Sequence, residues 1–202
     1  HLAISLIENR LNSAFENIKY EVVGAPKDLQ GAINLAERDK YQFQWWACSL
    51  VGAQPSMGHK KGADKGIDGV IYFQDELGPA KKIVVSIKGG ENVSVTMIRD
   101  LKGVMEREKS PIGLFVTLYE PTRAMIEEAA TAGMYRSPAT DKPFPKLQIL
   151  TVDGLLRGFE KPYFKDLTRG RLTFKSPKKE KLRGDNGAKD MFSSKKKKTT
   201  AQ

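Results

Sequence analysis

Residues 112–119 (IGLFVTLY) are apolar almost without interruption, and this run constrains the fold more than any other feature. A strand of this composition is typical of the centre of a sheet that is covered on both faces. An amphipathic stretch at 94–109 precedes it, with apolar residues at helical spacing. Before that, β-branched runs at 69–73 (GVIYF) and 82–88 (KIVVSIK) flank a turn-rich segment, as in a hairpin. The sequence therefore predicts a hairpin, a helix and a parallel strand, joined by a right-handed crossover.

The segments on either side of this unit extend the sheet and cover it. Apolar spacing, capping residues and breaks at glycine or proline predict helices at 1–16, 28–38, 41–51, 122–133 and 153–159, and strands at 20–23 and 147–152. The expected fold class is thus α/β, a mixed sheet with helices on both faces. Fold alone determines no function, so the function must be argued from particular residues.

The charge of the chain is concentrated at its C-terminal end. The 202 residues carry a net charge of +10, most of it in residues 171–202, which contain the run KKKK and few apolar residues. Such a segment buries too little apolar surface to offset the entropy of ordering, so we expect a disordered tail. A basic tail binds polyanions without reading their sequence, or it serves only to keep the protein in solution.

Several classes of protein are disfavoured by composition. No apolar run approaches the roughly 18 residues that cross a bilayer, and the first residues do not resemble a signal peptide, so no membrane partner is expected. Cys48 is the single cysteine, which leaves no internal disulfide and no thiolate cluster for zinc. A reducing, cytoplasmic location fits this pattern. Because residue 1 is His, we expect a processed chain or part of a longer one.

An acid and a lysine are expected to meet at one end of the predicted hairpin. Asp68 begins the first strand and Lys88 ends the second, so antiparallel pairing makes them neighbours. A carboxylate there, with the backbone carbonyl of Ile87, could bind Mg²⁺ or Mn²⁺, while the ammonium steadies an attacking water against a phosphodiester. The alternative is an ordinary exposed ion pair, which is common at strand ends.

The arrangement resembles a nuclease family. Asp68 with the glycines around it, a strand, a turn, and then residues 84–90 (VVSIKGG) resemble the PD-(D/E)XK nuclease core in its Mrr-like restriction endonuclease branch. The resemblance spans roughly residues 41–135. It implies a restriction-endonuclease-like fold, with Asp68 as the metal-binding carboxylate, Lys88 as the catalytic lysine and Asp64 as an accessory metal-binding acid.

Two positions depart from the pattern of that family. Ser86 stands two residues before Lys88, where the family has an acid or Gln, and Gln44 stands at the helix position that often bears Glu. A hydroxyl and an amide are weak ligands for Mg²⁺, so these two members of the expected catalytic site reduce its negative charge. The resemblance therefore leaves room for a weak nuclease or for a binding module without activity. Glu91, just beyond Lys88, is a possible compensating acid.

DNA is the expected partner of this site. Lys60, Lys61 and Lys65 precede Asp68 and could contact phosphates, or they could be ordinary solvated charges. Beyond Lys88, Gly89 and Gly90 are expected to let a phosphate backbone approach closely. The primary hypothesis is a Mg²⁺-dependent DNA endonuclease domain of a restriction-modification system. The resemblance to that nuclease family also implies a homodimer.

A second resemblance concerns the start of the chain. HLAISLIENRL followed by IKYEVVG resembles the end of an amino-methyltransferase domain that acts on DNA. It implies that residues 1–27 are a remnant of such a domain whose catalytic part is absent from this chain, that 28–170 form the nuclease domain and that 171–202 form the tail. The alternative function is then a non-catalytic module that binds DNA and positions the target of the methyltransferase.

Overall fold

The computed structural model describes residues 2–15, 18–56, 66–168, 170 and 172–174, and it confirms the mixed α/β fold. Five strands form the main sheet in the order β1-β2-β3-β4-β7. The pairs β1–β2 and β2–β3 are antiparallel, whereas the pairs β3–β4 and β4–β7 are parallel. Their bounds are β1 (Gln54–Pro55), β2 (Gly69–Phe73), β3 (Lys81–Lys88), β4 (Ile112–Thr117) and β7 (Leu147–Thr151). The predicted hairpin and parallel crossover are both present.

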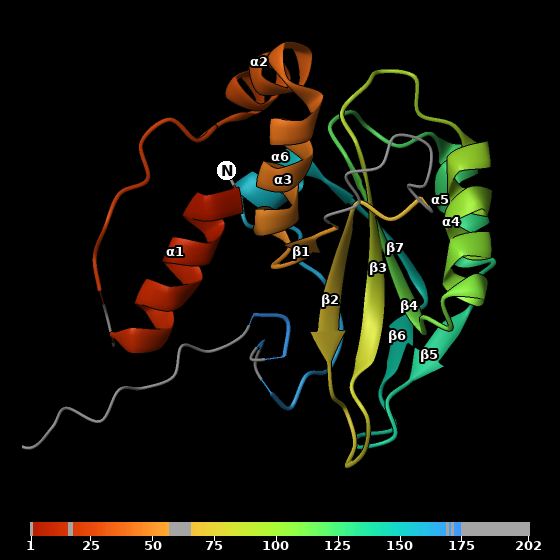
Figure 1. Ribbon diagram of the computed structural model, residues 1–202. Coiled ribbons are helices and arrows are strands. Elements are labelled where there is room, and N and C mark those ends of the chain that lie inside the picture. Colours follow the sequence, from red (N-terminus) through yellow and green to blue (C-terminus); the bar gives the residue numbers. More distant parts are fainter. Residues whose placement is uncertain (1, 16–17, 57–65, 169, 171, 175–202) are drawn as a thin grey trace, which may run out of the picture.

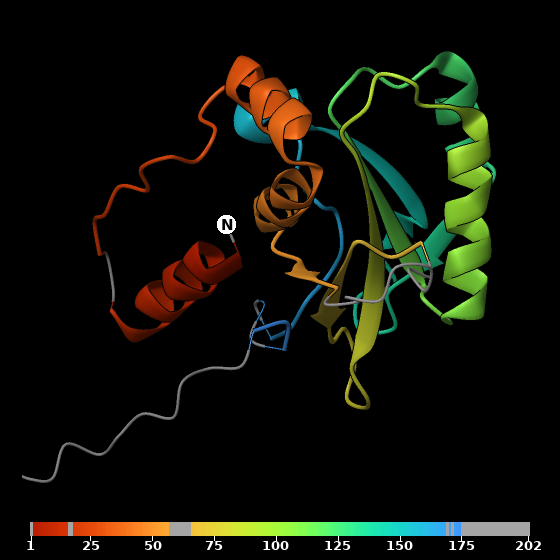
Figure 2. The same ribbon diagram turned by 45° about the horizontal axis from the view of Figure 1, so that its top comes forward.

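Helices cover the two faces of the sheet (Figure 1). On one face lie α1 (Leu2–Ala14), α2 (Leu29–Arg38), α3 (Lys40–Leu50) and α6 (Val152–Leu156), and on the other lie α4 (Val95–Arg107) and α5 (Arg123–Ala130). The view in Figure 2 shows the same separation, with the sheet between the two groups of helices. The core is accordingly divided into two apolar clusters, one on each face.

The alternation of side chains along the central strands explains why both faces are apolar. In β3, Val85 and Ile87 belong to the cluster under α2 and α3, while Val84 packs under α4. In β4, Leu114 faces the first cluster and Phe115 the second, and every residue of this strand is buried. Because successive side chains point to opposite faces, a central strand with helices on both sides must be apolar throughout.

The helix starts follow local hydrogen bonding. Asp28 caps α2 by accepting from the backbone N–H of Gly31 at 2.7 Å, and Asp39 caps α3 by accepting from Tyr41 and Gln42. Asp39 follows the last residue of α2 and caps the start of α3, so this one residue separates the two helices. This arrangement directs α3 toward the start of β2 and the end of β3, where it contributes Gln44 to the candidate site.

Several sequence-based element predictions were wrong. Residues 20–23 form no strand, and Val23 is 87% exposed, because no described strand lies beside them to pair with their backbone groups. The final helix was predicted at 153–159, but α6 begins at Val152 and ends at Leu156. Three short strands were not expected, namely β1 and the separate antiparallel pair β5 (Met134–Arg136) and β6 (Pro143–Pro145).

The outer edge of β2 is protected by the chain after α6. The backbone N–H of Gln74 donates to Asp166, and the hydroxyl of Thr173 both accepts from and donates to the backbone of Tyr72. Thr173 is 3% exposed, so ordered packing continues just past residue 170. These contacts cover an edge that would otherwise offer unpaired backbone groups. The remainder of the predicted basic tail, 175–202, lies outside the described residues.

Candidate functional site

Asp68 and Lys88 lie together at one end of the sheet. Gly69 pairs with Val85 in the antiparallel register, and the backbone N–H of Asp68 donates to the carbonyl of Val85 at 2.9 Å. This places the Lys88 ammonium 4.0 Å from Oδ2 of Asp68. The side chains are 35% exposed for Lys88 and 19% for Asp68, so the pair is partly open to solvent. The juxtaposition expected from the hairpin is therefore present.

Both oxygens of the Asp68 carboxylate accept hydrogen bonds from the protein. Gln44 in α3 donates from Nε2 to Oδ1 at 3.0 Å, and the backbone N–H of Ile87 donates to Oδ2 at 2.7 Å. The second contact is made by the N–H of Ile87, and the role of its carbonyl as a metal ligand stays a prediction. The carboxylate thus joins helix α3 to the end of the β-hairpin.

Ser86 and Lys88 project from the same face of β3, because they are two residues apart in a strand. The register that pairs Gly69 with Val85 sets Asp68 opposite Ser86. An acid at position 86 would consequently bring a second carboxylate beside Asp68. Ser86 is 5% exposed and its hydroxyl carries no charge, so the site lacks that acid.

The described residues of the site offer a divalent cation only one carboxylate, that of Asp68. Magnesium is bound through carboxylate, carbonyl and water oxygens, whereas Gln44 turns its N–H toward Asp68 and Lys88 adds a positive charge. Within the described part of the chain, no three His, Cys, Asp or Glu side chains gather closely enough to hold a metal ion. Asp64, the accessory ligand in the sequence hypothesis, lies outside the described residues.

The predicted DNA contacts are only partly described. Lys60, Lys61 and Lys65 lie outside the described residues. Gly90 is exposed, and a Cβ there would meet nothing within 4 Å. At Gly89, by contrast, a Cβ would come within 2.9 Å of the Phe43 ring in α3. Close helix packing is thus enough to explain this glycine without a phosphate.

Glu91 lies near Tyr119, and Cys48 is buried behind Asp68. Burial raises the pKa of Tyr119 above its ordinary value, and the negative charges of Glu91 and Glu37 raise it further, which places Glu91 beside that tyrosine. Burial also strongly raises the pKa of the Cys48 thiol, followed by the charge of Asp68. Cys48 is 0% exposed and donates to the Asp68 carbonyl at 3.6 Å, so it packs as a thiol and is no nucleophile.

The acids of the hairpin turn are far from this site, as expected. Asp75 is fully buried at the opposite end of the sheet, where it accepts from Lys81 and from the Tyr135 hydroxyl. Glu76 also pairs with Lys81. This network joins the β2–β3 turn to the β5–β6 pair. The contact that sequence reasoning missed is the N–H of Ile87 on Asp68, and no side-chain pattern indicates a backbone donor.

The fold is that of a restriction-endonuclease-like domain, and in its described part Gln44 and Ser86 stand at two positions where acids were expected. A family model described as NACHT-associated inactive restriction endonuclease 1 matches residues 49–157, just over half of the chain. The chain belongs to this family. No curated protein and no solved structure matches it.

The family match corrects the predicted enzyme activity. The sequence hypothesis of an active Mg²⁺-dependent DNA endonuclease is wrong, because the family is one of inactive restriction endonucleases. The side chains agree with this correction, since Gln44 and Ser86 stand where two catalytic acids were sought. The match supports the restriction-endonuclease-like fold but not the Mrr-like branch or the fusion to a methyltransferase.

The described helices include none that is both long enough and apolar enough to span a bilayer. The cytoplasmic location expected from the sequence stays a prediction.

Proposed function

We propose that this domain is a non-catalytic DNA-binding module that contacts phosphates without a metal ion, in a protein associated with a NACHT domain. The association is taken from the description of the family. The observation that carries the proposal is the state of the Asp68 carboxylate, whose two oxygens accept from Gln44 and Ile87 beside the Lys88 ammonium.

The charges at this site support phosphate binding in place of metal binding. An active site of this type concentrates carboxylates that attract a cation, whereas here one carboxylate faces one ammonium and two neutral donors. With Asp68 already satisfied by neighbouring donors, the half-exposed Lys88 can offer its remaining N–H groups to a phosphate oxygen. The net charge of +10 adds a general attraction to DNA.

The test compares duplex DNA binding and DNA cleavage in the full chain. Fluorescence anisotropy with a labelled duplex should give the same affinity in Mg²⁺ and in EDTA, and supercoiled plasmid should remain intact in Mg²⁺ and in Mn²⁺. Nicking that depends on the metal, or DNA affinity that requires it, would contradict the proposal.

Substitution of Lys88 tests whether this face takes part in binding. Each phosphate contact contributes about 0.9 to the magnitude of the slope of log affinity against log salt concentration. If Lys88 makes one such contact, Lys88→Gln should reduce the magnitude of that slope by about 0.9. Lys142→Gln is the matched control, since Lys142 is exposed and lies in the loop between β5 and β6, which contacts Asp75 at the opposite end of the sheet. An equal loss in both variants would assign the binding to general charge and would leave no role for the site.

A further inference from the structure

A pocket of about 530 Å³ opens at the end of the sheet opposite the Asp68 site. It lies between the C-terminal ends of α4 and α5 and the starts of β4 and β7. Helix α4 has 13 residues and spans about 20 Å, so the pocket is well separated from Lys88, which lies before the start of that helix. The volume is within the range of sites that hold a ligand or a short peptide segment.

The floor of the pocket is apolar. Met105, Pro111 and Ala132 line it, and Met105 is itself 7% exposed. Methionine adapts its shape to different apolar groups, because its side chain is unbranched and polarizable. The floor can therefore receive an apolar side chain of moderate size, such as leucine.

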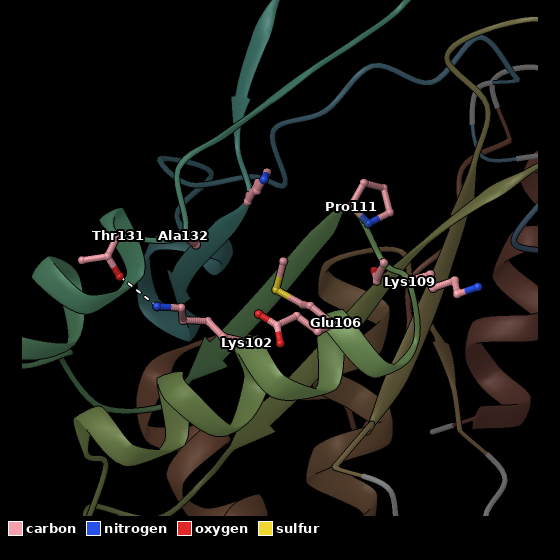
Figure 3. Close-up of a pocket in the computed structure, with 9 residues that line it drawn as sticks. Lys102, Glu106, Lys109, Pro111, Thr131 and Ala132 are labelled. Atoms are coloured by element: carbon pink, nitrogen blue, oxygen red, sulfur yellow. Dashed lines mark hydrogen bonds between the residues drawn. The ribbon is translucent and has the colours of Figure 1, made fainter.

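The rim of the pocket carries three lysines. Lys102 donates to Glu128 at 2.9 Å and to the hydroxyl of Thr131 at 2.9 Å. Figure 3 shows the bond between Lys102 and Thr131. Lys109 and Lys146 are exposed, and neither pairs with a carboxylate of the described residues. Figure 3 shows Lys109 at the edge with its ammonium directed outward, from where its flexible stem can reach a bound acidic group.

Glu106 favours an acidic peptide over a phosphate as the ligand of this pocket. Glu106 lines the pocket between Lys102 and Lys109 and is exposed without an ion-pair partner among the described residues. The C-terminal ends of α4 and α5 add partial negative charge from their last carbonyls. A phosphate would be repelled by both features. A peptide backbone, in contrast, can donate its N–H groups to them while its acidic side chains meet the lysines.

We infer that this pocket binds a short acidic segment of a partner protein, with one leucine-like side chain on the floor formed by Met105, Pro111 and Ala132. The glutamate or aspartate side chains of that segment pair with Lys109 and Lys146, and Lys102 stays fixed by Glu128. The inference does not depend on the proposed DNA binding, because the two surfaces occupy opposite ends of the sheet.

The test uses the full chain and a fluorescein-labelled peptide in which glutamates flank a central leucine. Anisotropy should show saturable binding, and Lys109→Glu combined with Lys146→Glu should weaken it about fivefold or more. Lys40→Glu combined with Lys161→Glu changes the net charge equally outside the pocket and should have little effect. Absence of binding, or equal loss in both double variants, would overturn the inference.

Two further measurements locate the peptide. Replacing its leucine by serine should weaken binding if the apolar floor is used. In methyl NMR spectra, the resonance of Met105, assigned with Met105→Leu, should shift when the peptide is added. An unmoved Met105 resonance would refute the location, and a larger shift with duplex DNA at the same concentration would show that the pocket is a nucleic-acid site.

Discussion

Replacing Gln44 by glutamate tests the central contact of the site. In the structure Nε2 of Gln44 donates to Oδ1 of Asp68 at 3.0 Å, so the substitution removes a hydrogen bond to a charged group, which contributes about 1.5–3 kcal/mol. It also sets two carboxylates about 3 Å apart, and their repulsion at an effective dielectric constant of 20 is of the order of 5 kcal/mol before solvent screening.

Proton uptake limits this penalty. Protonating a carboxyl group with an ordinary pKa near 4.3 at pH 7 costs about 4 kcal/mol, so the pair takes up a proton before the repulsion exceeds that amount. We therefore expect Gln44→Glu to lower the free energy of unfolding by about 2–4 kcal/mol at pH 7. The pKa of the introduced carboxyl rises on folding, so the destabilisation is full at neutral pH and diminishes as pH falls toward 4.

The assay is urea unfolding followed by tryptophan fluorescence between pH 4 and pH 7. Gln30→Glu is the matched control, because Gln30 is exposed on α2 and its side chain donates to the neutral amide of Asn34 rather than to a carboxylate. Adding Mg²⁺ should restore stability to Gln44→Glu and not to the control, since a cation that binds the folded state at a hundred times its dissociation constant stabilises it by about 2.7 kcal/mol. A variant as stable as the control at every pH would refute the contact on which the proposal rests.

Three other changes test the packing and the edge of the sheet. Gly69→Ala should destabilise the protein by about 1–3 kcal/mol, since its Cβ would lie 2.7 Å from Sγ of Cys48, and Cys48→Ala should relieve part of the loss in a double-mutant cycle measured by chemical unfolding. Burial raises the pKa of Asp166, but hydrogen bonds from backbone N–H groups and the Thr168 hydroxyl lower it more, so its pKa in the folded protein is below the ordinary value. The ionised carboxylate therefore stabilises the fold above about pH 4, and this stability should be lost as pH falls further. In thermal unfolding, Asp166→Asn should flatten that dependence on pH. Thr173→Val should cost about 1–3 kcal/mol and speed amide exchange at Tyr72, because its hydroxyl bonds both backbone groups of that residue, and unchanged exchange would contradict this role.

The local pattern of the sequence was sufficient for the central part of the fold. The period of two and the β-branched residues predicted strands at 69–73 and 82–88, which correspond to β2 and β3. The unbroken apolar run after residue 111 corresponds to β4, because a central strand is buried on both faces. The caps at Asp28 and Thr122 also follow from local chemistry, since each side chain bonds a backbone N–H three residues onward.

Other features depended on contacts between distant residues. Strand β1 has two residues and exists only because β2 lies beside it, while 20–23 has strand-forming residues but no described partner. The burial of Thr173 against Tyr72 joins positions about a hundred residues apart, and no local signal in either segment indicates it. The pocket near Met105 is likewise assembled from three separate segments of the chain, 102–111, 131–132 and Lys146.

Most of the described residues of the candidate site were predicted from the sequence, namely Asp68, Lys88, and Ser86 and Gln44 in place of acids. What those groups do to one another was decided by the tertiary structure, because a carboxylate can hold a cation or accept donors from its neighbours according to which atoms face it. Helix α3 turns an amide N–H toward Asp68, and the strand end adds the N–H of Ile87. Side-chain identity follows from the chain, whereas the direction in which a donor points follows from packing.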